Sequence, residues 1–143
     1  MSRPRSLREM AVVAGVTLSQ ARSAVADELV DPAELSWVDA LALRVALPVQ
    51  TMLLSGESDP RNVTKLVSTR TSEAVRLTRD AAAADCLGRD AVLVVGRTSA
   101  AVHPSLADAT SRSGSMMYAD GVMLALPVGQ WWSEFRWRPA EGA

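Results

Sequence analysis

Residues 8–29 read REMAVVAGVTLSQARSAVADEL. This stretch consists of two amphipathic segments on either side of a glycine, and it decides which fold we expect for the N-terminal part of the chain. Just before this stretch, Ser6 stands three residues ahead of Glu9, the spacing of a capping box at a helix start. In a capping box each side chain accepts a hydrogen bond from the other residue's backbone amide. We therefore expect a first helix over residues 7–14.

A second helix is predicted directly after the glycine. Thr17 is placed to cap the segment LSQARSAVADELV, residues 18–30, whose apolar residues recur at three- and four-residue spacing. Two helices cross closely only where their contact residues are small, and the turn between them needs left-handed backbone. Ala11 and Ala21 meet the first demand and Gly15 meets the second, so the pattern predicts a helix-turn-helix.

A third helix and a boundary follow. Ser36 is placed to cap WVDALALRVAL, residues 37–47, and Pro48 is expected to end or kink that helix. The next residues include glycine, proline and several polar side chains, which is the composition of a linker. We therefore predict two units, a helix-turn-helix unit over residues 1–56 and a second unit over residues 61–143.

The second unit mixes helices and strands. One or two helices are expected between residues 62 and 87, with Gly88 as their stop, and AVLVVG at 91–96 has the β-branched composition of a buried strand. Residues 99–103 either continue or pair with that strand, and Asp120-Gly121 predicts a hairpin turn. The final segment is either a strand or a short helix. The predicted fold class is α+β, a three-helix unit followed by a small mixed domain with helices and an antiparallel sheet.

The stretch from residue 7 to residue 54 resembles the DNA-binding unit of MerR-type regulators. In this resemblance AGVTLSQARSAV is the helix-turn-helix and LSWVDALALRVAL is the helix after the wing. The likeness covers about the first third of the chain. Where the family has a wing with basic and aromatic residues, this chain has only the short, acidic VADELVDPAE.

The helix-turn-helix geometry assigns DNA contacts, because the second helix lies in the major groove with its early residues at the base edges. Arg22 is suited to guanine and Gln20 to adenine. The predicted base-facing residues are Thr17, Ser19, Gln20, Arg22 and Ser23, and the predicted phosphate contacts are Arg3, Arg5, Arg8 and Arg44. The expected function is a sequence-specific transcriptional regulator that binds double-stranded DNA as a homodimer.

An ordinary three-helix bundle remains the alternative to a DNA-binding unit. Residues 1–60 hold eight acidic and five basic residues, so any basic surface there is local. The densest positive stretch lies later, between residues 61 and 79, with Glu73 as the one opposing charge. It either adds phosphate contacts, pairs with the acidic N-terminal unit, or forms a solvated helix face. Its members are Arg61, Lys65, Arg70, Arg76 and Arg79.

Large aromatic side chains gather near the C-terminus. They are Trp131, Trp132, Phe135 and Trp137. Such a cluster needs a packed environment, which is either the core, a dimer interface or a surface that binds a partner. The alternative function is therefore an antitoxin-type or other protein-binding module that covers a partner through its Trp-rich C-terminal half.

Catalysis and metal binding find little support in the sequence. The one histidine, His103, and the one cysteine, Cys86, are too few for a zinc site, and one cysteine cannot form an internal disulfide. No phosphate-loop or dinucleotide motif occurs. The first ten residues are charged and lead into no long apolar run. We expect a cytoplasmic, non-enzymatic protein without a cofactor or membrane partner.

Overall fold

The computed structural model describes residues 3–55, 60–96, 99–110 and 123–136. Within these residues the fold is α+β, as the sequence predicts, with a three-stranded antiparallel sheet. One further helical turn begins at residue 106. The elements are α1 (Leu7–Ala14), α2 (Leu18–Ala26), α3 (Trp37–Ser55), α4 (Pro60–Ala83), β1 (Val92–Gly96), β2 (Ala100–His103), β3 (Met123–Leu126) and α6 (Val128–Arg136).

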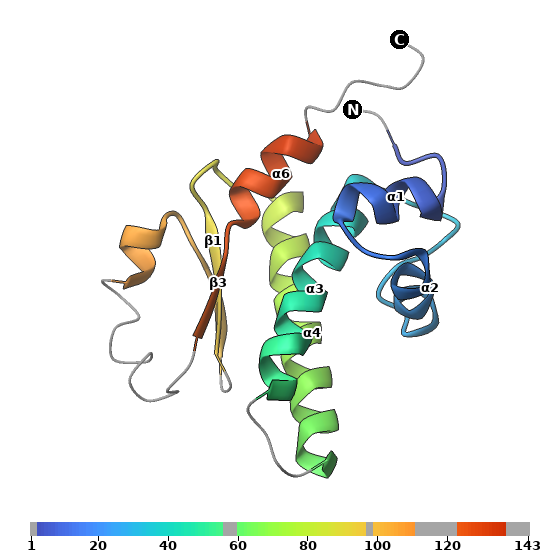
Figure 1. Cartoon of the computed structure of the whole chain (residues 1–143). Coiled ribbons are helices and arrows are strands. Elements are labelled where there is room, and N and C mark those ends of the chain that lie inside the picture. The colour runs from blue at the N-terminus through green and yellow to red at the C-terminus, as the bar shows by residue number, and fades with distance from the viewer. Residues whose placement is uncertain (1–2, 56–59, 97–98, 111–122, 137–143) are drawn as a thin grey trace.

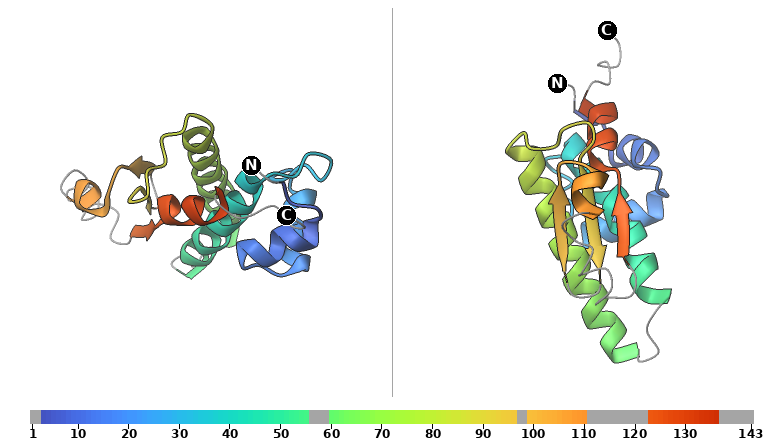
Figure 2. Two further views of the ribbon diagram at one scale, coloured as in Figure 1. Left: turned by 90° about the horizontal axis from the view of Figure 1, so that it is seen from above. Right: turned by 90° about the vertical axis from the view of Figure 1, so that its left-hand side faces the viewer.

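The elements form three layers around the long helices (Figure 1). Helices α3 and α4 lie side by side in the middle, the sheet covers one side of them, and α1 and α2 lie on the other side. The views in Figure 2 show the same order of layers from two further directions. Helix α6 crosses one end of the molecule and contacts both α3 and β1. The helix-turn-helix region is therefore mounted on the central helices, away from the sheet.

Helix α1 begins at the predicted cap. The Ser6 Oγ accepts a hydrogen bond from the Glu9 amide at 3.1 Å. The Glu9 carboxylate, however, accepts from the amide of Arg5 at 2.8 Å. The amide that pairs with the Glu9 carboxylate thus belongs to the residue before the predicted one, and this bond ties the arm that precedes α1 to its first turn.

Helix α1 ends where the sequence predicts, at a left-handed glycine. Gly15 has φ 74°, a backbone conformation that side chains with a Cβ rarely adopt. Its amide donates to the carbonyl of Val12 at 3.2 Å, and the Val16 amide donates to that of Ala11 at 3.0 Å. This pair of bonds is a Schellman motif, which satisfies the last carbonyls of the helix and turns the chain toward α2.

Helix α2 is shorter than the predicted segment 18–30, because it stops at Ala26. Glu28 adopts φ 61°, and the Leu29 amide donates to the carbonyl of Ala24 at 2.9 Å. This is a second Schellman ending, here with glutamate in the left-handed position. The prediction was wrong because the apolar spacing continues through Leu29 and no glycine marks the stop.

Helix α3 passes through Pro48 and continues to Ser55, so the proline does not end it. Proline lacks an amide hydrogen, which removes the donor that would serve the carbonyl of Arg44. Helix α4 ends at Ala83, before the predicted stop at Gly88. Asp85 takes the left-handed position there with φ 55°.

One buried cluster joins all layers. It includes Met10 of α1, Leu41 of α3, Ala74 of α4, Leu93 of β1 and Trp132 of α6. These side chains are almost fully buried, and the cluster crosses the predicted boundary between residues 56 and 61. The two predicted units therefore share a core among the described residues.

The sheet has the strand order β2-β1-β3, and both pairings are antiparallel. Val94 of β1 lies opposite Ala101 of β2 and Ala125 of β3. Residues 99–103 thus pair with the first strand, one of the two predicted arrangements. The predicted turn at Asp120-Gly121 lies outside the described residues. Leu93 and Val95 of β1 belong to the main core.

The final segment forms helix α6, one of the two predicted alternatives. The backbone at the start of α6 closely approaches the backbone of the turn before β1. The Gly129 amide donates to the carbonyl of Ala91 at 3.0 Å. A Cβ on Gly129 would lie 2.0 Å from the carbonyl oxygen of Gly88. Only glycine allows the backbone of α6 to meet the turn before β1 at this distance.

Candidate nucleic-acid interface

The crossing of α1 and α2 depends on small side chains. Ala11 and Ala14 of α1 and Ala21 and Ala24 of α2 are all buried in the main core. These alanines let the two helix backbones approach, as the helix-turn-helix pattern predicts. The packing leaves Ser19, Arg22, Ser23 and Ala26 of α2 exposed.

Helix α2 begins at a complete capping box. The Thr17 Oγ1 accepts from the Gln20 amide at 3.1 Å, and the Gln20 Oε1 accepts from the Thr17 amide at 2.8 Å. The box stabilises the helix start, and each such cap contributes about 1 kcal/mol. It also occupies the oxygen that Gln20 would use to accept from the N6 amino group of adenine. A bidentate adenine contact by Gln20 therefore requires that this bond be broken or shared.

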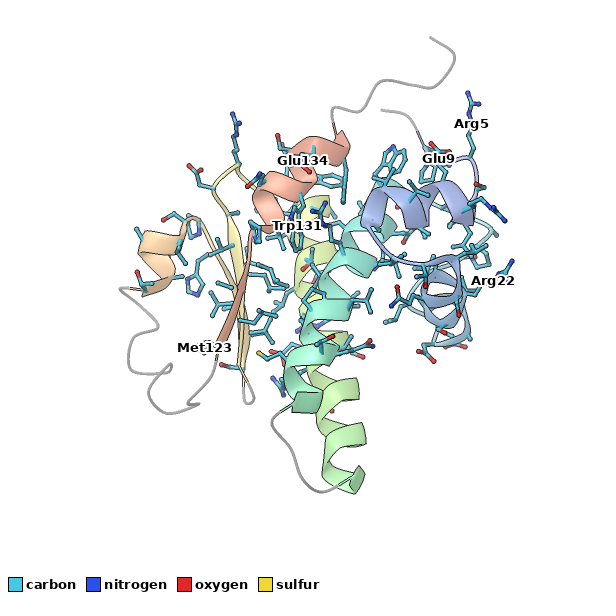
Figure 3. The ribbon with its side chains drawn as sticks, viewed as in Figure 1. Arg5, Glu9, Arg22, Met123, Trp131 and Glu134 are labelled. Carbon is cyan, nitrogen blue, oxygen red and sulfur yellow. The ribbon has the colours of Figure 1, made fainter. Side chains whose placement is uncertain are left out.

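The outer face of α2 carries an available arginine. Ser19, Arg22 and Ala26 recur at helical spacing, and all three are exposed. Arg22 makes no ion pair with any described residue. Figure 3 shows its side chain pointing outward from α2, away from the central helices. The predicted base-facing residues are all at least partly accessible, since Thr17, Ser19, Gln20, Arg22 and Ser23 are exposed.

The arm before α1 adds positive charge to the same end of the molecule. Arg3, Arg5 and Arg8 are exposed, whereas Pro4 between the first two is buried and anchors the arm. In Figure 3 the side chain of Arg5 points outward beyond α1, on the outer side of the molecule where Arg22 also lies. The structure therefore brings the arm and α2 together on one side.

Arg44, the fourth predicted phosphate contact, is engaged elsewhere. Its guanidinium lies 4.5 Å from the ring centroid of Trp131 and 5.9 Å from that of Phe135. Its Nη1 also lies 3.8 Å from the Glu134 carboxylate. Because these partners all belong to α6, Arg44 joins α3 to α6 in this structure.

No strand forms in the connection between α2 and α3, so the described residues contain no wing there. The connection is acidic and largely exposed. Asp31 caps its own turn, because its Oδ1 accepts from the Ala33 amide at 2.9 Å. The exposed acidic residues, which follow the C-terminal end of α2, are Asp27, Glu28, Asp31 and Glu34. They are thus at the opposite end of α2 from its cap at Thr17.

The basic stretch of α4 is mostly neutralised. Arg70 pairs with Glu73, and Arg76 pairs with Asp80 at 3.6 Å. Arg79 pairs with Asp39 of α3, which is the predicted alternative of pairing with the N-terminal unit. The side chains of Arg61 and Lys65 lie outside the described residues. The described part of this stretch therefore adds no unpaired arginine to a DNA surface.

The aromatic cluster contributes to the core. Trp132 is 5% exposed and Phe135 is 2% exposed, and both belong to the main cluster. Trp131 is half-buried beneath Arg44, and Trp137 lies outside the described residues. For Trp132 and Phe135 packing within the chain is thus the predicted core alternative, and partner binding by the rest of the set stays a prediction.

One polar pair near the sheet was not among the predicted site residues. His103, at the end of β2, lies with its Nδ1 3.2 Å from the Asp108 carboxylate. Ser105 caps the turn that carries Asp108, since its Oγ accepts from the Asp108 amide at 3.1 Å. The S-x-x-D spacing of residues 105–108 was the available signal. No group of three His, Cys, Asp or Glu side chains suited to a metal ion occurs among the described residues.

Comparisons of the chain with protein families, with curated proteins and with solved structures give no match. None of the described helices combines the length and the apolar character that a membrane span requires. The geometry of α1, α2 and the arm is therefore what bears on function.

Proposed function

We propose that this chain is a sequence-specific DNA-binding transcriptional regulator that inserts α2 into the major groove. The observation that carries the proposal is the exposed guanidinium of Arg22, which has no partner among the described residues, on the outer face of a helix held by an α1–α2 crossing. Arginine reads guanine through two hydrogen bonds in the major groove. The neighbouring Ser19 and Ser23 have short polar side chains that let the helix approach the bases.

The arm supplies the phosphate contacts in this proposal. Arg3, Arg5 and Arg8 precede or begin α1 and are exposed. Phosphate contacts position a protein on the duplex without specifying sequence. Arg44 is left out of the contact set because α6 holds it.

The acidic connection limits how α2 can dock. Asp27 and Glu28 follow the C-terminal end of the helix and repel phosphates if they approach them. When the N-terminal half of α2 enters the groove first, the two carboxylates stay away from the DNA. This is the usual docking of a recognition helix. The proposed orientation therefore places Thr17 and Ser19 closest to the groove floor.

A homodimer completes the proposal, since a two-fold pair of α2 helices reads two half-sites spaced one helical turn apart. The test is selection of genomic fragments that the purified full-length chain retains. The proposal expects an enriched motif with inverted symmetry and binding that weakens steeply as salt is raised. Retention of fragments without any shared motif would contradict it.

A further inference from the structure

A groove runs between α2 and α3, and its lining shares Gln20 and Ser23 with the residues predicted to face DNA. Its volume is about 220 Å³, and side chains from one face of each helix line it. The hollow exists because two buried alanines, Ala24 of α2 and Ala46 of α3, stand where larger side chains would fill the space. Leu43 and Leu47 of α3 form an apolar wall beside them.

One end of the groove is negative and uncompensated. Asp27 lines the groove at the C-terminal end of α2, and its carboxylate has no partner among the described residues. The last turn of α2 contains no basic residue. Since a helix C-terminus carries partial negative charge, the carboxylate and the helix end act in the same direction. This end of the groove attracts a cation.

Two further polar groups stand near that carboxylate in the lining. Ser23 precedes Asp27 by one helical turn, and Gln50 enters from α3. The side chains of both residues are without hydrogen-bond partners among the described residues. A hydroxyl and an amide oxygen can accept the remaining hydrogens of an ammonium group.

We propose that this groove binds a small amphipathic organic cation, a primary ammonium on a short hydrocarbon chain. The ammonium lies at Asp27, and the hydrocarbon lies along Leu43 and Leu47. The volume is below the usual range of about 300 to 1,000 Å³ for drug-sized ligands, which limits the ligand to a few carbons. Because Asp27 is exposed, the ion pair is weak, and the expected affinity is millimolar. Any effect on DNA would rest on the proposed function, whereas binding to the protein alone does not.

The test is a titration of the uniformly ¹⁵N-labelled full-length chain with hexylammonium chloride at constant ionic strength, followed by amide chemical shifts. We expect saturable shifts confined to α2 and to the part of α3 that lines the groove. Hexanoate, with the same chain length and the opposite charge, is expected not to bind. Equal affinity for hexanoate, shifts that do not saturate, or shifts spread over the whole surface would each overturn the proposal.

Three variants distinguish the contribution of the Asp27 charge to binding from that of the groove volume. Asp27→Asn keeps the shape and removes the charge, so we expect at least fivefold weaker binding of hexylammonium. Asp31→Asn removes an exposed carboxylate that does not line the groove and is expected to leave binding unchanged. Ala46→Leu fills the hollow and is expected to abolish binding. Unchanged affinity of the Asp27→Asn protein would refute the assignment even if the Ala46→Leu protein failed to fold.

Discussion

Arg79 of α4 lies with its Nη2 2.7 Å from the Oδ1 of Asp39 at the start of α3. The same nitrogen donates to the carbonyl of Leu29, just beyond α2. Asp39 is 5% exposed, and its other oxygen accepts from the Ser36 amide at 2.8 Å and from the Ser36 hydroxyl at 3.2 Å. One buried carboxylate thus ties α4, the start of α3 and the end of the helix-turn-helix together.

Replacing Arg79 by methionine should destabilise the protein. The change keeps most of the apolar stem but leaves the Asp39 carboxylate buried with fewer donors. Hydrogen bonds to charged groups contribute about 1.5 to 3 kcal/mol, so we expect a loss of that size in urea unfolding. Arg76→Met is the matched control, because Arg76 pairs with Asp80 in the open and exposed pairs contribute at most about 1 kcal/mol. If both variants lost the same free energy of unfolding, the pair of Arg79 with Asp39 would contribute no more than an exposed ion pair.

Replacing Glu28 by glycine should stabilise the protein. The left-handed conformation at φ 61° costs an ordinary residue about 1 to 2 kcal/mol, and glycine avoids most of that cost. We expect a net gain of about 1 kcal/mol after the greater freedom of glycine in the unfolded chain is subtracted. The measurement is the urea midpoint.

Glu28→Ala separates backbone from charge in that experiment, because alanine removes the carboxylate but keeps the Cβ. The backbone explanation predicts little or no gain for alanine. If the alanine and glycine variants were equally stabilised, repulsion among the acidic residues of the connection would be the cause instead.

The two glycines that meet at the start of α6 should respond oppositely to alanine. Gly129→Ala places a Cβ 2.0 Å from a backbone oxygen, which α6 can relieve only by moving. Strain of this kind costs about 1 to 3 kcal/mol. Gly88→Ala meets no atom within 4 Å, so we expect it to be neutral or slightly stabilising. A thermal scan of both variants makes the comparison, and a Gly129→Ala protein as stable as the parent would show that the contact yields easily.

Local signals account for what the sequence predicted well. Ser6, Thr17 and Gly15 act through bonds to residues a few positions away, so the start and end of α1 and the start of α2 could be read from the chain. The ends of α2 and α4 could not, because Glu28 and Asp85 take left-handed positions that sequence patterns reserve for glycine.

Contacts between residues far apart in the chain could not be predicted from the sequence. The pairing of Arg79 with Asp39 and the stacking of Arg44 on Trp131 join helices far apart in the chain, and no local spacing encodes them. The exposure of Ser19 and Arg22, two of the residues proposed to face DNA, was predictable because α2 must bury Ala21 and Ala24, which turns Ser19 and Arg22 outward. The cap bond that occupies Gln20 follows from the T-x-x-Q spacing at the start of α2, which is a capping-box pattern.

We expect the chain to form a dimer, because two α2 helices related by a two-fold axis would read two half-sites. Light scattering at micromolar concentration measures the oligomeric state. The expected mass is about twice the chain mass of 15.2 kDa. A mass of one chain would overturn the predicted dimer.

The central claim is that α2 reads bases through Arg22. The most direct test compares the affinity of the Arg22→Ala protein for the selected DNA site with its affinity for a random duplex of equal length. We predict a loss of about 1 to 3 kcal/mol on the selected site and a much smaller loss on random DNA, because a guanine contact exists on the first alone. Equal losses on both duplexes, or no loss on either, would contradict the assignment of Arg22 to base recognition.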